Sequence, residues 1–172
     1  MASASMKNSL RRDDGTIPTV ELSGQAGRLS FALLEVLPAN NPGAGDLHLV
    51  VVVEAEGFVG ERSVWIEAAR WNQFLTQLEV LESRRQGEAE ISGMSPEQFE
   101  LKVRSVDRAG HMGVFGTLTR HMTAQGDRYT NHLQFGFVFC PTLLPSFLQS
   151  CQALTSNGSA LTDSPDLPTA TT

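Results

Sequence analysis

The side chains best suited to metal or proton chemistry are the four histidines, His48, His111, His121 and His132. Imidazole binds transition metals, and its charge changes near neutral pH. On one regular strand His111 and His121 would lie about 33 Å apart, too far to share a metal ion. Only cross-strand pairing of His121 with His132 would build a compact site. Without an HExxH or CxxC spacing, imidazoles at the surface or packed on a sheet are favoured, and no metal ligand is predicted.

The segment from Asp107 to His111 brings an acid, a guanidinium and an imidazole close together in the sequence. Asp107 and Gly110 are typical of a tight turn, because Asp bonds to nearby backbone and glycine tolerates a positive φ. Polar loops of this kind also carry binding sites, so partner binding is the alternative interpretation. The predicted partner-binding residues are Asp107, Arg108, His111, His121 and His132.

Motifs of nucleophilic catalysis and of phosphate binding are missing from the sequence. A hydrolase elbow needs GxSxG, and a nucleotide-binding loop needs GxGxxG or GxxxxGK followed by Ser or Thr; none of these spacings occurs. No catalytic residue and no cofactor is therefore predicted. The glycines of the second half are predicted at turns and bulges instead; they are Gly110, Gly113, Gly116 and Gly126.

The two cysteines, Cys140 and Cys151, are too few for a disulfide framework. Cys140 precedes Pro141 at a predicted helix start, where the helix dipole would lower the pKa of its thiol. The neighbouring Val138 and Phe139 favour burial, which would raise that pKa instead. Both cysteines are therefore predicted to be reduced thiols in the core.

Composition favours a folded, cytoplasmic protein that binds neither nucleic acid nor membrane. The chain has 172 residues, 41% of them hydrophobic, which is enough for a real core. Its net charge of −6 works against binding phosphate backbones. The longest apolar run, Leu49 to Val53, is far shorter than the roughly 20 residues that cross a bilayer. Residues 1–12 lack the apolar stretch of a secretory signal.

Alternation of apolar and polar residues, typical of half-buried strands, dominates the middle of the chain. It is clearest toward Phe139, where one predicted face carries Tyr129, Asn131, Leu133, Phe135, Phe137 and Phe139. Further strands are predicted at Thr19–Leu22, Leu29–Leu37, Leu47–Ala55, Glu61–Ile66 and Phe99–Arg104.

Two segments change to helical spacing, Trp71 to Leu81 and Pro141 to Leu154. The resulting order predicts an α+β fold, mainly antiparallel sheet of about eight hairpin-connected strands with two amphipathic helices packed against it. The order suggests two similar halves, although no repeat of residues is visible. Polar composition predicts a flexible arm over 1–15 and a disordered tail over 155–172, flanking a single domain over 16–154.

One combination of residues between Trp65 and Pro145 is similar to a known family. Its first part comprises Trp65, Ile66, Phe74, Leu78, Glu79, Leu81, Glu82, Gly87, Glu88, Ala89, Met94, Ser95, Pro96, Glu97, Phe99 and Leu101. Its second part comprises Asp107, Arg108, Gly110, His111, Val114, Gly116, His132, Leu133, Phe135, Gly136, Phe137, Pro141, Leu144 and Pro145. This pattern resembles the WapI-type bacterial immunity proteins. One departure is Cys140, where the pattern has an acidic residue before the proline.

The resemblance implies a non-enzymatic protein that binds and neutralises a cognate bacterial toxin. The acidic balance of the chain agrees with a basic partner, because complementary charge speeds association. The leading hypothesis is therefore a protein-binding protein that occludes a partner's surface. The alternative is a small-molecule or metal-binding domain that uses the region of His111, His121 and His132. A third hypothesis is an assembly protein whose sheet edges pair between subunits.

Overall fold

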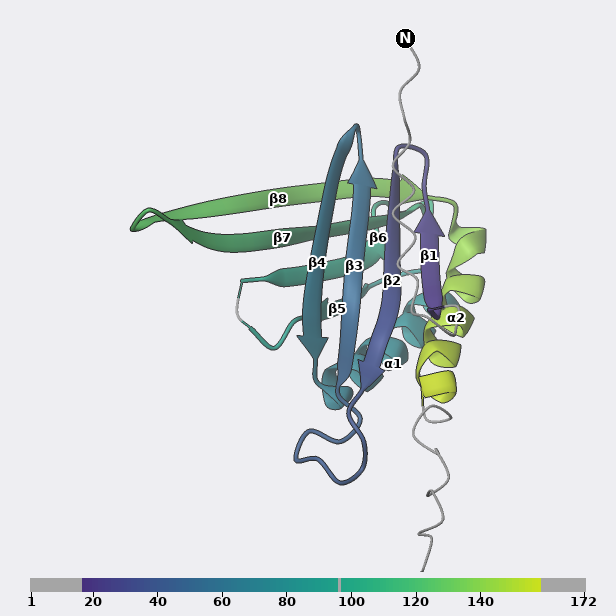
Figure 1. Ribbon diagram of the computed structural model, residues 1–172. Coiled ribbons are helices and arrows are strands. Elements are labelled where there is room, and N and C mark those ends of the chain that lie inside the picture. Colours follow the sequence, from purple (N-terminus) through teal and green to yellow (C-terminus); the bar gives the residue numbers. More distant parts are fainter. Residues whose placement is uncertain (1–16, 96, 159–172) are drawn as a thin grey trace, which may run out of the picture.

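The computed structural model describes residues 17–95 and 97–158, and its strands form two four-stranded antiparallel sheets (Figure 1). The first sheet has the order β1-β2-β3-β4 and the second the order β5-β6-β7-β8, so each is a simple meander. The predicted α+β class with antiparallel sheet is confirmed. The first half contains β1 (Thr19–Ser23), β2 (Gly27–Val36), β3 (Leu47–Ala55), β4 (Phe58–Ile66) and α1 (Ala68–Arg84). The second contains β5 (Glu88–Ser92), β6 (Phe99–Ser105), β7 (Met112–Ala124), β8 (Asp127–Phe139), a short 3-10 turn (Pro141–Leu143) and α2 (Leu144–Gly158).

The two sheets pack face to face over one shared core, and Figure 1 shows the long strands of the second sheet running across those of the first. Alternation along each strand supplies the core, since every second side chain points inward. Phe31 illustrates this sharing: its ring meets Trp71 of α1, Phe99 of β6 and Phe147 of α2 at centroid distances of 6.0, 6.5 and 6.4 Å. The two halves therefore share a topology but depend on one common core.

Side chains of the helix α1 cover the outer edge of the second sheet. Gln77 accepts a hydrogen bond from the backbone N–H of Glu90 on β5 at 2.9 Å. Arg70 donates to Ser92 Oγ at 2.9 Å and to the Gly93 carbonyl at 3.2 Å. These bonds occupy backbone and side-chain groups at the β5 edge, where another strand would otherwise pair.

The first sheet also contacts the edge of β8. The backbone N–H of Gln25, in the turn between β1 and β2, donates to the carbonyl of Val138 at 3.0 Å. Gly24 and Gly27 make this approach close, because a Cβ at either position would lie 2.5 Å from the Phe137 ring. The inner half of β8 is therefore fixed against the first sheet.

Several local predictions are wrong, and strand alternation explains most of them. Cys140 is exposed, because it shares the outward parity of Val138 rather than that of buried Phe139; Cys151 is buried as predicted. Gly113 and Gly116 are not turn or bulge glycines, because β7 keeps an unbroken register with both neighbouring strands. Gly110 and Gly126 do have the positive φ of turn glycines.

The second helix differs from its predicted end. It continues past Leu154 to Gly158, so the predicted tail would have begun inside the helix. The predicted arm over 1–15 and the rest of the tail, 159–172, lie outside the described residues.

Candidate functional site

The predicted binding loop from Asp107 to His111 is an exposed, self-bonded turn between β6 and β7. Asp107 accepts hydrogen bonds from the backbone N–H of His111 at 3.1 Å and from its Nδ1 at 2.5 Å. The side-chain bond to His111 lowers the pKa of Asp107 below its usual value. Arg108 is exposed in the same turn. Asp107 and His111 therefore stabilise the turn through bonds to each other. For the third charged side chain of the turn, Arg108, the structure gives no hydrogen bond or ion pair.

His121 and His132 lie on facing strands and share one face of the β7-β8 hairpin. In the register Thr119 is opposite His132 and His121 is opposite Thr130, which makes the two histidines diagonal neighbours. Each imidazole uses Nδ1 in a bond to the threonine opposite, at 2.8 Å for His132 and 3.0 Å for His121. The structure thus brings these two predicted residues together.

The third histidine of the predicted group does not join them. His111 precedes the first residue of β7, whereas His121 lies toward the other end of that strand. Within the described ranges no group of three or more His, Cys, Asp or Glu side chains is arranged to hold a metal ion. The predicted partner-binding residues therefore fall at two separate places.

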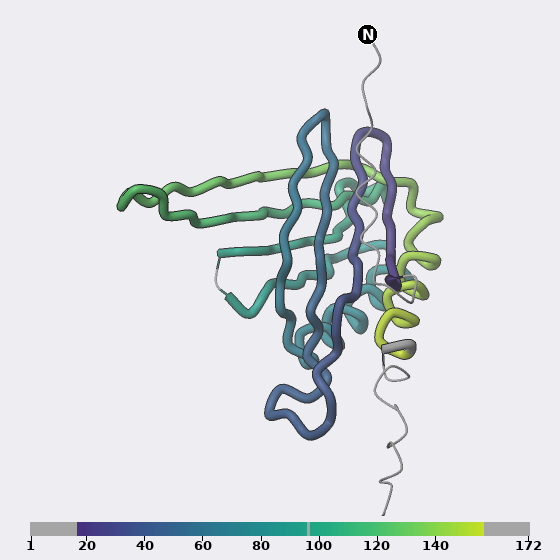
Figure 2. Tube along the Cα trace, viewed as in Figure 1, coloured from purple at the N-terminus to yellow at the C-terminus, as the bar shows by residue number. Residues whose placement is uncertain are grey.

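The end of the β7-β8 hairpin projects beyond the rest of the molecule (Figures 1 and 2). Every residue from 120 to 132 is exposed, so both faces of this ribbon meet solvent; we call it the hairpin arm. Its turn, Gln125 and Gly126, has φ of 52° and 90°, as a two-residue hairpin turn requires. Met122 and Tyr129 are cross-strand partners on it, 42% and 52% exposed. The arm therefore presents large apolar side chains with no core beneath them.

An open groove of about 450 Å³ separates the arm from the edge strand β4. We call it the arm groove. At its inner end β4 and the hairpin meet closely, because a Cβ on Gly60 would lie 2.5 Å from Leu133 Cδ2 and 2.9 Å from Leu118 Cδ1. Its walls are formed by residues 59–62 of β4, 118–120 of β7 and 130–133 of β8.

Two arginines line the arm groove from opposite walls. Arg62 shares the inward parity of Val64 on β4, and Arg120 shares the inward parity of Leu118 on β7. The Nε of Arg62 is buried and has no hydrogen-bond partner among the described residues. Neither arginine forms an ion pair within that part of the chain. The groove therefore holds two guanidinium groups without a carboxylate partner among the described residues, although Glu61 also borders it.

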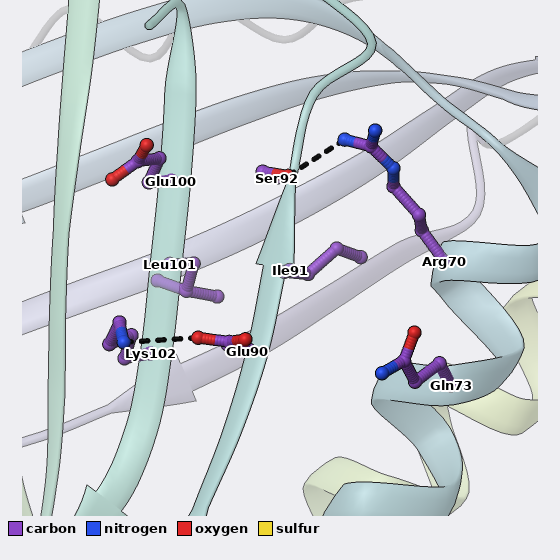
Figure 3. Close-up of a pocket in the computed structure, with 8 residues that line it drawn as sticks. All are labelled: Arg70, Gln73, Glu90, Ile91, Ser92, Glu100, Leu101 and Lys102. Atoms are coloured by element: carbon purple, nitrogen blue, oxygen red, sulfur yellow. Dashed lines mark hydrogen bonds and ion pairs between the residues drawn. The ribbon is translucent and has the colours of Figure 1, made fainter. Parts of the chain in front are cut away.

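A second groove, of about 430 Å³, lies between α1 and the strands β5 and β6 (Figure 3). Three of its four charged groups, Lys102, Glu90 and Arg70, already have partners. Lys102 pairs with Glu90 at 3.0 Å and Arg70 bonds to Ser92 at 2.9 Å, as the dashed lines in Figure 3 show. Because Lys102 is paired with Glu90 and Arg70 also pairs with Glu67 at 3.4 Å, this groove offers a ligand less unpaired positive charge than the arm groove does.

Arg62 and Arg120 were not predicted as site residues, although strand alternation contains the signal. Each is a charged residue two positions from a buried core residue of the same strand, Val64 for Arg62 and Leu118 for Arg120. A charge with inward parity is informative, because most such positions are apolar.

No model of a protein family and no curated protein matches this chain. The resemblance to WapI-type immunity proteins therefore stays a prediction. In the part of the chain that the structure describes, no helix combines the length and the apolar character needed to cross a membrane.

Proposed function

We propose that this protein acts by binding another protein and occluding part of its surface with the hairpin arm. The observation that carries the proposal is the exposure of both faces of the arm over residues 120–132. An isolated two-stranded ribbon is marginally stable in water, because neither face buries apolar surface. A partner packed on one face would supply the missing burial.

Apolar side chains gather on the side of the arm that faces β4. Met122 and Tyr129 extend the inner face of the hairpin beyond Leu118 and Leu133, and they are 42% and 52% exposed. Tyr is enriched at the centres of protein interfaces, since it buries a large area at a small cost in rotamer entropy. These residues are the proposed contact, and the sequence resemblance suggests a bacterial toxin as the partner.

The test compares two variants of the tagged full-length chain in its own host. Met122→Ala with Tyr129→Ala removes the apolar contact from the arm, whereas Val80→Ala truncates a valine, 43% exposed, on α1. We expect native mass spectrometry to find one protein bound at fixed stoichiometry to the wild type and to Val80→Ala. The arm variant should lose this partner while retaining the wild-type melting temperature.

Retention of the partner by the arm variant would place the contact elsewhere. A bound metal ion or small molecule without a protein partner would favour the alternative of a ligand-binding domain.

A further inference from the structure

The edge strand β4 exposes unpaired backbone groups along the arm groove. Ala55 and Phe58 flank a two-residue turn, which makes them a hydrogen-bonded pair of the hairpin. Bonded and non-bonded pairs alternate in an antiparallel ladder, so odd-numbered residues of β4 direct their N–H and C=O groups away from β3. The carbonyl of Trp65 confirms this phase, because it accepts a bond from the N–H of Met94 at 2.8 Å. Within the described part of the chain, no other backbone partner meets the outward groups of Val59, Glu61 and Ser63.

This exposed edge contrasts with the β5 edge and with the inner end of β8. Side chains of α1 bond to the β5 edge, and the turn between β1 and β2 bonds to β8. An exposed edge can accept an additional strand from another chain, whose main chain then supplies affinity and whose alternate side chains supply specificity.

Charge indicates which kind of strand would fit. Arg62 and Arg120 share the inward parity of their strands, whereas Glu61, which also borders the groove, has the opposite parity on β4. Two guanidinium groups that line one groove favour an anion between them, because each attracts negative charge. A carboxylate is the matching group, because a guanidinium binds it through two parallel N–H bonds.

The unpartnered Nε of Arg62 supports the same ligand. A buried donor without a partner is unfavourable, and burial of this kind is rare in native proteins. A carboxylate in the groove would allow the guanidinium to turn and to donate from both Nε and an adjacent Nη. The positive charge of Arg62 and Arg120 is also opposite in sign to the net charge of the whole chain, which is −6.

We propose that β4 binds an extended acidic segment of the partner as an additional antiparallel or parallel strand, with a carboxylate held between Arg62 and Arg120. This inference rests on the proposed function and specifies the chemistry of the partner. The backbone of the segment pairs with the outward N–H and C=O groups of β4. Every second side chain of the segment then points into the arm groove. Its acidic positions are those that face the two arginines.

The probe is a fluorescein-labelled peptide that alternates Thr and Glu, with a Thr and Lys peptide as its matched control. We expect the acidic peptide to bind the wild-type chain and the basic peptide not to bind. Arg62→Gln and Arg120→Gln should each weaken binding about tenfold in fluorescence anisotropy. Arg84→Gln, on the exposed side of α1, should leave it unchanged.

A second variant tests the strand pairing separately from the charge. Glu61→Pro removes an outward N–H from the middle of β4 without removing a bond to β3, because proline is tolerated on edge strands with that orientation. Glu61→Pro should abolish peptide binding, whereas Glu61→Ala should not weaken it. Circular dichroism and thermal melting establish that each variant is folded.

Equal binding of the basic peptide, or unchanged binding by both arginine variants, would overturn the inference. The same variants in the host experiment separate it from the proposed function. If Arg62→Gln with Arg120→Gln retains the partner that the arm variant loses, the acidic-strand inference fails and the proposed function stands. If the partner is lost from the arm variant, from the arginine variant and from Glu61→Pro, both stand.

Discussion

Replacement of Gly116 by alanine tests how tightly the second sheet is packed. Gly116 lies in the middle of β7, opposite Leu101 on β6 and Phe135 on β8. A Cβ at this position would lie 2.4 Å from the backbone carbonyl oxygen of Glu100 and 2.6 Å from Cζ of Phe135. The oxygen belongs to the backbone of a hydrogen-bonded strand, so it cannot rotate away as a side chain would. The substitution therefore requires β6 or β7 to shift.

Two opposing effects determine how much Gly116→Ala changes the free energy of unfolding. Overpacking of a rigid core site costs about 1–3 kcal/mol in the free energy of unfolding. Alanine also restricts the unfolded chain, which stabilises by about 0.4–1 kcal/mol where the native φ suits it. The φ of Gly116 is not in the positive region, so this gain applies. The net expectation is a loss of roughly 1–2 kcal/mol, or about 2–8 °C in melting temperature.

Urea denaturation measured by tryptophan fluorescence is the assay, because Trp71 is 1% exposed in the core and reports unfolding. Gly60→Ala is the matched control. Its Cβ would also come within 3 Å of other atoms, but those atoms are the methyl ends of Leu133 and Leu118, which can rotate. We expect Gly60→Ala to stay within about 1 kcal/mol of the wild type. If Gly116→Ala were as stable as Gly60→Ala, the backbone contact at Glu100 would not be rigid and the reasoning would be wrong.

Thiol chemistry and loop titration give further tests. Cys140 is exposed, and a hydrogen bond with Thr142 lowers the pKa of its thiol. The Cys140 thiolate should therefore react with DTNB in the native protein. Thr142→Val removes the hydrogen bond and should slow the reaction. Cys151 is buried and its thiol pKa is raised, so its labelling should require urea; native labelling of both thiols would contradict this assignment. The bond from His111 lowers the folded-state pKa of Asp107. The ionised Asp107 should therefore stabilise the folded loop at pH values above the ordinary carboxyl pKa. This stabilisation should be lost as the pH falls through the lowered pKa of the folded state. His111→Ala should raise that pKa toward its usual value in a carboxyl NMR titration, and an unchanged pKa would argue against the bond.

Most of the fold could be predicted because strand alternation and helical spacing are local properties of the sequence. The run Leu47–Ala55 forms β3 with the predicted bounds, and the apolar positions from Trp71 to Leu81 face the core from α1. Whether the strands form one sheet or two depends on pairing between distant segments, which alternation does not specify.

Burial along the hairpin arm is a second feature that strand alternation does not predict. Tyr129, Asn131 and Leu133 continue the face that carries Phe135, as predicted, but burial stops near Leu133 because the hairpin extends past the first sheet. Strand length, rather than residue type, exposes these side chains. Sequence alone offers cross-strand pairing of His121 with His132 only as the condition for a compact site, and the arm groove depends on where β4 lies in space.

The meander topology of each half has a consequence for folding kinetics. Each strand pairs with its nearest neighbour in the sequence, and turns such as Glu56 and Gly57 span only two residues. Closing such short loops costs little entropy, so the hairpins should form early. Contacts such as Phe31 with Phe99 and Phe147 join the two halves across a much longer stretch of chain. Docking of the preformed meanders around this aromatic cluster is therefore the step expected to limit the folding rate.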